Sequence, residues 1–306
     1  MTTLARPIQT ASHDETRGML LGLVGVAMFS LTLPFTRMAV AELDPLFVAL
    51  GRALGAALLA GAWLAWRRAP LPPLTALRPL ALVMLGVVVG FPLLSSLALR
   101  HVPASHGAVL AGLLPLMTTL YAALRGDERP STGFWAMSVL GAALVVGFAL
   151  SQGGGALHAA DLLMFGAVAA GAVGYAEGGK LSRTLGGPET ICWALLLAAP
   201  LVAPLLAWRW HAGMDSLAGV GAAAWLGLAY VTVFSMVIGF FFWYRGLALG
   251  GIARVGQVQL LQPFLSLVSA ALLLGEALTL HNSLFALAVI GVVFAGRRLQ
   301  VRRRPA

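Results

Sequence analysis

The sequence predicts an all-α membrane protein of ten transmembrane helices, arranged as two inverted five-helix repeats. Three observations support this prediction: the composition, an internal repeat, and the distribution of basic residues. The chain of 306 residues is 59% hydrophobic and only 10% charged, whereas soluble domains are nearer a quarter charged. A lipid bilayer tolerates so much apolar surface, and the long apolar runs fit helices better than alternating barrel strands.

The second observation is that the first half of the chain returns in the second half with an offset of 148 residues. Residues 113–116 read Leu-Leu-Pro-Leu, and residues 261–264 read Leu-Gln-Pro-Phe. Ala-Ala-Leu follows at 122–124 and again at 270–272. Each copy holds five apolar runs. Because five is odd, the copies enter the membrane in opposite directions, as in alternating-access transporters.

The first copy is predicted to occupy residues 18–152, after a cytoplasmic N-terminal tail of residues 1–17. Helix-breaking residues separate its apolar runs, among them the stretch 67–73 with three prolines and the stretch 125–130, which ends in Pro130. The predicted spans are 18–41, 46–66, 79–99, 104–124 and 131–150. The first run is too long for a signal-peptide core and has no convincing cleavage site, so we expect it to be retained.

The second copy is predicted to occupy residues 153–298, and its three glycines at 153–155 form the natural hinge between the copies. Its predicted spans are 159–182, 189–208, 218–244, 252–275 and 279–298. Residues 299–306 form a basic cytoplasmic tail. Near the start of each copy an offset of 143 superposes Pro45 on Pro188 and Arg37 on Lys180.

The third observation is that basic residues follow membrane topology. All Lys and Arg residues except Arg37, Arg52, Arg100 and Arg209 fall in the tails, in the loops on their side of the membrane, or at the span ends next to those loops. Cytoplasmic loops carry the excess of basic residues, so both termini are predicted to be cytoplasmic, in a bacterial inner membrane. The same distribution argues against nucleic acid as a partner, because the charge forms no compact patch.

With these features the sequence resembles the drug/metabolite transporter superfamily, in its ten-helix branch with two EamA-type repeats. The resemblance covers about residues 18–298. It rests on the fourth-span string from Leu114 to Glu128, on its ninth-span copy from Gln262 to Glu276, and on Arg52 and Arg37 near the second and first spans. It implies a central cavity lined mainly by the first, third, fourth, sixth, eighth and ninth spans.

Members of that superfamily move amino acids, purines, drugs or other metabolites, and the short loops here look most like bacterial exporters of aromatic and neutral amino acids. The expected function is therefore export of such amino acids by alternating access. Export of purines, drugs or other metabolites is the alternative, and so is lipid flipping. Beyond a small-molecule substrate and membrane lipid, protons are a candidate coupling partner; the oligomeric state is left open.

No motif for catalysis, a metal or a cofactor is visible, and the sequence lacks a phosphate-binding loop. We therefore expect a transporter that is not an enzyme and holds no cofactor. A membrane-embedded transferase, the alternative from another class, would need acids or histidines clustered at the interface.

Glu177 is the acidic residue that lies most clearly inside a predicted span, where an ionisable group is a candidate functional site. It can bind a substrate ammonium or carry a proton, or it can pair with Lys180 three residues on. Arg37 and Lys180 can bind substrate carboxylates or form ion pairs at a gate. The alternative is that they only snorkel to the interface at helix ends. Arg52 lies about 10 Å beyond Pro45 along its helix, where it can bind substrate or the carbonyls of a broken helix.

Further candidates are polar and aromatic residues in the spans. Amides in one span are costly against lipid, so the glutamines are expected to face protein or a cavity. Tyr121 and most of the aromatic run 240–244 are expected to anchor helix ends at the interface, His106 is expected to be an interfacial histidine, and Glu128 and Glu276 are each expected to cap the following helix. The predicted substrate-binding set is Arg37, Ser95, Ser96, Tyr175, Glu177, Trp225, Tyr230, Gln257, Gln259 and Gln262, and the predicted structural and gating set is Pro34, Arg52, Pro92, Pro115, Lys180 and Pro263.

Overall fold

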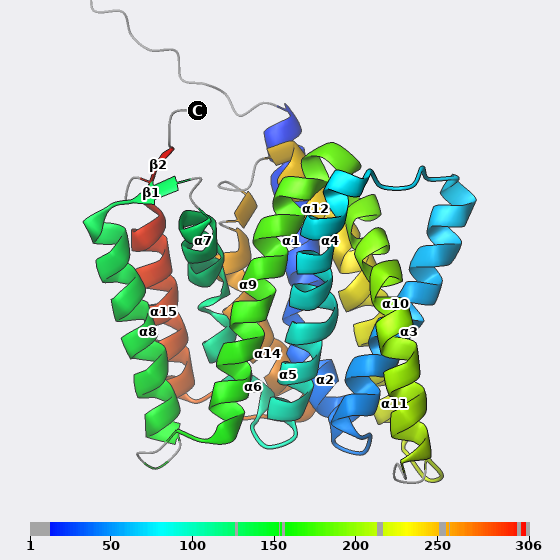
Figure 1. Ribbon diagram of the computed structural model, residues 1–306. Coiled ribbons are helices and arrows are strands. Elements are labelled where there is room, and N and C mark those ends of the chain that lie inside the picture. The colour runs from blue at the N-terminus through cyan, green and yellow to red at the C-terminus, as the bar shows by residue number, and fades with distance from the viewer. Residues whose placement is uncertain are drawn as a thin grey trace, which may run out of the picture.

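The computed structural model describes residues 13–125, 128–152, 154, 157–212, 217–250, 255–256, 258–298 and 301–303. These residues form a bundle of membrane-length helices with a short two-stranded ribbon at one end (Figure 1). Eight helical segments of at least 18 residues are apolar enough to cross a bilayer, and the shorter apolar segments Gln259–Leu274 and Leu280–Gly296 complete ten spans. The predicted fold class is confirmed.

The first repeat supplies five spans, of which the first, third and fourth are built from more than one helix. In order, they are α1 (His13–Ser30) with α2 (Thr32–Val40); α3 (Pro45–Arg67); α4 (Leu74–Val83), η1 (Met84–Gly90) and α5 (Phe91–Leu99); α6 (Ala104–Ala111) with α7 (Leu114–Leu124); and α8 (Thr132–Gln152).

The second repeat again supplies five spans, of which the eighth and ninth are composite. In order, they are α9 (Ala159–Leu185); α10 (Gly187–His211); α11 (Ala222–Tyr230), η2 (Val231–Ile238) and α12 (Gly239–Gly250); η3 (Gln259–Leu261) with α14 (Gln262–Leu274); and α15 (Leu280–Arg298).

The two repeats run in opposite directions through the bundle. In Figure 1, α1 starts at the upper end and runs downward, whereas α9 starts at the lower end and runs upward. The last helix, α15, also ends at the upper end. There β1 (Glu128–Pro130) pairs antiparallel with β2 (Val301–Arg303), which joins the loop after the fourth span to the C-terminal segment.

Helix interruptions occur at equivalent places in the two repeats. The third span has a π-helical turn at Met84–Gly90, and the eighth has one at Val231–Ile238, which agrees with the offset of 148. The fourth and ninth spans break just before Pro115 and Pro263, each of which lies in the first turn of the helix that follows. A proline in that turn costs no hydrogen bond, because its missing N–H has no partner inside the helix.

Pro92 also lies in the first turn of a helix, α5, directly after the π-helical turn η1. Pro34 lies inside α2, three residues beyond the break at Leu31. The four prolines predicted to shape the spans therefore lie within three residues of interruptions in the helical hydrogen bonding, which is where the interior of the bundle becomes irregular.

Small residues bring the repeats into close contact around these breaks. A Cβ atom placed on Gly86 of η1 would lie 2.5 Å from the carbonyl oxygen of Ala170 and 2.6 Å from the backbone nitrogen of Gly174 on α9. Those neighbours are backbone atoms and cannot move aside. Glycine is thus required where the third span crosses the sixth, as in other close helix crossings in membranes.

We expect Gly86→Ala to destabilise the protein by about 1–3 kcal/mol, because the added methyl group overpacks a rigid contact. Gly147→Ala is the matched control, since no atom lies within 4 Å of the position that its Cβ would take. Thermal unfolding of the purified variants in detergent measures the difference. Equal unfolding temperatures for the two variants would contradict this account of the crossing.

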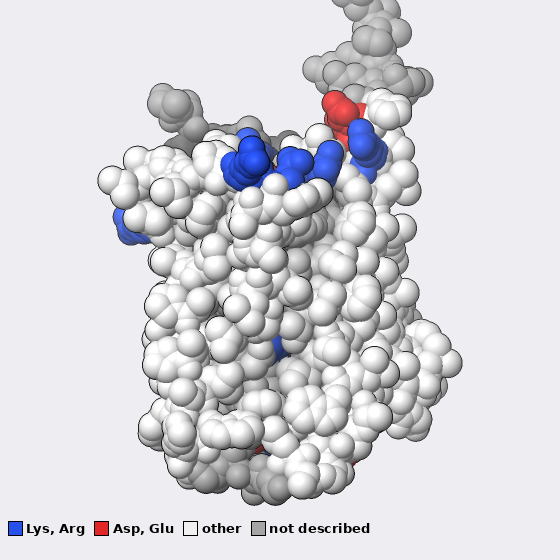
Figure 2. Space-filling model, turned by 90° about the vertical axis from the view of Figure 1, so that its right-hand side faces the viewer, with Lys and Arg blue, Asp and Glu red and all other residues white. Residues whose placement is uncertain are grey.

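Charge separates the two ends of the bundle from its middle. Figure 2 shows Lys and Arg side chains gathered at the end where α1 begins, above a broad band that is almost free of charge on this face. This band is the surface expected to face lipid. The basic end is the one that the positive-inside rule assigns to the cytoplasm.

A labelling experiment tests that orientation. In a Cys192→Ala background, single cysteines at the exposed positions Leu157 and Ala212 are expected to react with a membrane-impermeant maleimide from outside the cell. Cysteines at His13 and Leu71 are expected to react only after the membrane is permeabilised. The reverse pattern would overturn the cytoplasmic placement of the termini.

Candidate functional site

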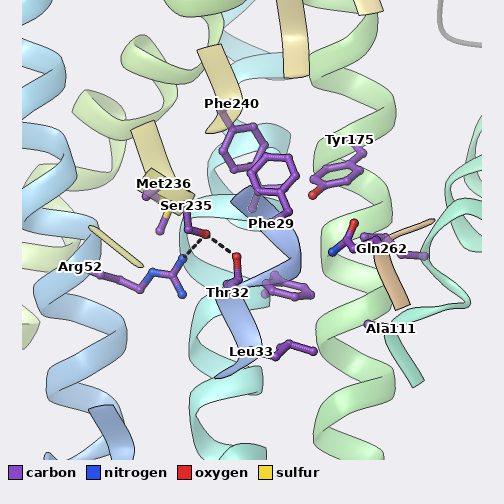
Figure 3. A pocket seen from close by; sticks show the side chains of 13 residues that line it. Phe29, Thr32, Leu33, Arg52, Ala111, Tyr175, Ser235, Met236, Phe240 and Gln262 are labelled. Atoms are coloured by element: carbon purple, nitrogen blue, oxygen red, sulfur yellow. Dashed lines mark hydrogen bonds between the residues drawn. The ribbon is translucent and has the colours of Figure 1, made fainter. Parts of the chain in front are cut away.

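A small cavity lies among the helix breaks (Figure 3). It offers about 30 Å³ to the centres of water-sized molecules, which is room for about two waters. Seven of the ten spans line it: the six implied by the resemblance and the second span, which adds Arg52. The lining residues are Phe29, Thr32, Leu33, Arg52, Val87, Phe91, Ala111, Leu114, Tyr175, Ser235, Met236, Phe240 and Gln262.

The cavity is built from repeat-related positions. The offset of 143 carries Thr32 onto Tyr175, and the offset of 148 carries Leu114 onto Gln262. Each of these pairs contributes both members to the wall. The charge does not follow this symmetry, because Arg52 corresponds to Leu195, which is fully buried and lies outside the lining.

Arg52 is the charged residue in the described lining, and it is only 2% exposed. Its Nη2 donates a hydrogen bond of 3.1 Å to Oγ of Ser235, which lies 2.8 Å from Oγ1 of Thr32. Its Nε and Nη1 are buried without a hydrogen-bond partner. Burying a guanidinium without a counter-charge costs several kcal/mol of solvation free energy. An anion that enters the cavity would offset this cost.

Aromatic rings form the side of the cavity nearest the basic end. The ring of Phe29 lies 4.8 Å from that of Phe240 and 6.0 Å from that of Tyr175, measured between centroids. Trp243 and Tyr244 are buried behind them, and the Tyr244 hydroxyl donates to the Gly174 carbonyl at 3.0 Å. The prediction that most of the run 240–244 is an interfacial belt is wrong, because three of these five side chains pack inside the bundle.

Among the predicted substrate-binding residues, Tyr175 and Gln262 line the cavity. Gln259 lies nearby, 3% exposed, and its Nε2 has no partner. Gln257 lies outside the described residues. Ser95 and Ser96 are buried outside the lining, and the Ser95 hydroxyl donates to the Phe91 carbonyl of its own helix at 2.6 Å.

Three other predicted residues have different neighbours. Arg37 donates to the carbonyls of Leu99 and Arg100 at 2.7 and 3.2 Å, so it fixes the end of α5. Trp225 is 38% exposed and packs edge-on against Phe47. Tyr230 stacks on Phe35, with ring centroids 4.1 Å apart, and donates to the Met28 carbonyl. None of the three belongs to the described lining.

Glu177 is buried outside the lining and has partners that the sequence did not indicate. Its Oε1 accepts from the Tyr121 hydroxyl at 2.8 Å and from Nε of Arg125 at 3.0 Å. Tyr121 therefore binds Glu177 rather than only anchoring a helix end. Lys180, which the sequence offered as one possible partner, is exposed. This cluster ties α7 of the first repeat to α9 of the second, two residues along α9 from Tyr175.

A second polar cluster ties the other half of the fourth span to α9. Nε2 of His106 lies 2.6 Å from Oδ1 of Asp161, and both side chains are buried. Glu276 accepts from the backbone N–H groups of Ala104 and Ser105 at 2.8 Å each. It therefore caps α6 of the other repeat, and the prediction that it caps the following helix is wrong. The side chain of Glu128 lies outside the description.

Phe29, Thr32, Ser235 and Phe240 are lining residues that sequence reasoning did not select. The repeat contained a usable signal for one of them, because Thr32 is the counterpart of the selected Tyr175. For Ser235 the signal was weaker, since its counterpart at the offset of 148 is the apolar Val87. In the described part of the chain, no group of three or more His, Cys, Asp or Glu side chains gathers as a metal site.

The inverted repeats, with broken helices around a central cavity, define a multi-pass membrane transporter. The chain belongs to the EamA-like transporter family, whose model matches residues 16–150 and 158–296. It is 49% identical to the uncharacterized transporter YdeK of Bacillus subtilis (strain 168), over 94% of this chain and 99% of that one.

Two more distant similarities are also found. The chain is 30% identical to a probable terminal-alkyne amino-acid exporter of Streptantibioticus cattleyicolor (strain ATCC 35852), over 67% of this chain and 68% of that one. A protein of known crystal structure superposes with a TM-score of 0.62 at 20% identity, over 92% of this chain and 96% of that one. That last likeness concerns the fold alone.

The ion pair at Glu177 yields a stability prediction. Arg125→Met leaves a buried carboxylate without its cation, whereas Glu177→Gln retains an oxygen that can accept from Tyr121. We expect Arg125→Met to lower the unfolding temperature more than Glu177→Gln, and the double variant to recover part of the loss. A double variant less stable than Arg125→Met would contradict direct pairing.

Proposed function

We propose that this transporter exports neutral or aromatic amino acids across the bacterial inner membrane by alternating access. The observation that carries the proposal is the chemistry of the central cavity. Its wall is mostly apolar and aromatic, with Phe29, Tyr175 and Phe240 in mutual contact. Sites of this composition bind apolar or aromatic groups and use a few polar residues for orientation.

The similarity to a probable amino-acid exporter supports the same substrate class and the outward direction. The alternatives fit the cavity less well. A cationic drug would call for an acidic side chain, and a lipid would call for a groove open to the bilayer. The lining instead has one charged residue, four hydroxyl or amide side chains and no acid among the described residues.

The polar clusters on α9 suggest how access alternates. The His106–Asp161 contact ties α6 to α9, and the Arg125–Glu177 contact ties α7 to α9 farther along the same helix. The cavity residues Ala111 and Leu114 flank the break between α6 and α7. Because the fourth span is broken there, one half can separate from α9 while the other stays bound, which opens one end of the cavity at a time.

The present cavity has room for about two waters, so it has to widen to admit an amino acid. Purified protein in proteoliposomes is to be tested with labelled phenylalanine, tryptophan, leucine, adenine, a cationic dye and a fluorescent phospholipid. We expect saturable counterflow of the amino acids. Counterflow of adenine or dye without amino acids, or scrambling of the phospholipid, would replace the proposal with the corresponding alternative.

The aromatic wall gives a prediction about selectivity. Phe240→Leu removes a ring from the cavity, and an aromatic contact is worth about 0.5–1.5 kcal/mol beyond its buried area. The ratio of phenylalanine to leucine counterflow is therefore expected to fall about two- to tenfold. Trp208→Leu, which changes a ring that is 64% exposed on the outer surface, is the matched control. An unchanged ratio in Phe240→Leu would remove this ring from the binding site.

A further inference from the structure

We propose that Arg52 binds the carboxylate of the transported amino acid and that Gln262 binds its ammonium group. This inference rests on the proposed function and makes the site specific for a zwitterion. It depends on unpartnered polar atoms at two positions in the cavity wall. These are Nε and Nη1 of Arg52, which can only donate hydrogen bonds, and Oε1 of Gln262, which can only accept them.

The guanidinium needs an anion that the described part of the chain does not supply. Ser235 is its hydrogen-bond partner, and no acidic side chain forms an ion pair with it among these residues. Arginine stays protonated in proteins, so it cannot escape the cost of burial by losing its charge. A ligand carboxylate satisfies both the charge and the free N–H groups, with the planar geometry that suits a guanidinium.

The neighbouring hydroxyl groups hold Arg52 toward the cavity. Ser235 on η2 accepts from Nη2 of Arg52 and contacts Thr32 on α2, so three spans meet at this side chain. Figure 3 shows the guanidinium and the two hydroxyls grouped on one side, with the Gln262 amide on the other. The aromatic rings of Phe29 and Tyr175 lie above and between them in this view.

This arrangement separates a donor group from an acceptor group across an apolar space. An α-amino acid presents the complementary pattern, with a carboxylate that accepts and an ammonium that donates. The ammonium also gains from the nearby aromatic faces, which attract cations. A neutral drug satisfies neither end, and a simple amine leaves Arg52 without an anion. The unpartnered atoms therefore select for both termini of the amino acid.

Ligand analogues test each terminus separately. The probes are L-phenylalanine, 2-phenylethylamine, which lacks the carboxylate, and 3-phenylpropionate, which lacks the ammonium. Binding is measured as the ligand-dependent rise in unfolding temperature of the purified full-length protein, which reports affinity without requiring transport. In the parent protein we expect each analogue to bind at least about tenfold more weakly than phenylalanine.

Two variants assign the termini to residues. Arg52→Met is expected to bind phenylalanine and 2-phenylethylamine equally, while still preferring phenylalanine to 3-phenylpropionate. Gln262→Leu is expected to bind phenylalanine and 3-phenylpropionate equally, while still preferring phenylalanine to 2-phenylethylamine. Arg52→Lys retains the charge without the planar group and is expected to recover part of the preference for the carboxylate. Arg209→Met is the matched control, because Arg209 pairs with Asp44 outside the cavity, and parent-like binding is expected.

The outcomes separate this inference from the proposed function. Suppose that the parent protein binds phenylalanine, and that Arg52→Met and Arg52→Lys still prefer phenylalanine to 2-phenylethylamine as strongly as the parent does. The carboxylate role of Arg52 is then wrong, while amino-acid transport stands. If Gln262→Leu keeps the full preference for phenylalanine over 3-phenylpropionate, the ammonium role of Gln262 is wrong. If the parent neither binds nor transports any amino acid, both proposals fall. Loss of the preference in Arg52→Met alone, with Arg209→Met unchanged, supports the assignment.

Discussion

The main constraint on this structure is that every backbone N–H and C=O group inside a bilayer needs a partner within the protein. Continuous helices meet this requirement anywhere, including against lipid. Interrupted helices meet it only where other protein segments cover the freed groups. The first, third, fourth, eighth and ninth spans are all interrupted, and all five line the cavity. The location of the site therefore follows from where the bundle can accommodate irregular backbone.

The same constraint explains why the breaks match across the repeats. The π-helical turns of the third and eighth spans and the proline-initiated helices α7 and α14 occupy corresponding positions. Inverted copies superpose in space about an axis in the membrane plane, so matched breaks meet at one depth. Close crossings such as that at Gly86 then bring third-span backbone against the continuous sixth span, which shields the interior from lipid.

Much of this fold was predictable because its determinants are local. Apolar length gave the ten spans, and the matching residues around Pro115 and Pro263 gave the repeat. The pairings were not predictable from spacing, since they join residues brought together only by tertiary packing. The contacts of Glu177 with Tyr121 and Arg125, for example, join the sixth span to the fourth and its end. Glu276 likewise caps a helix of the other repeat instead of the one that follows it.

The departure from symmetry at Arg52 bears on the proposed recognition of an anionic group. Its counterpart Leu195 is buried on the seventh span, which does not line the cavity in the described part of the chain, so the wall receives one arginine rather than a repeat-related pair. The lining therefore combines repeat-related pairs such as Thr32 and Tyr175 with a charge on one side only. In the proposed binding mode, a ligand with one anionic end has a single favoured orientation in the cavity. Under the proposed alternating access, repeat symmetry would serve the conformational change, and the single arginine would serve recognition of the ligand.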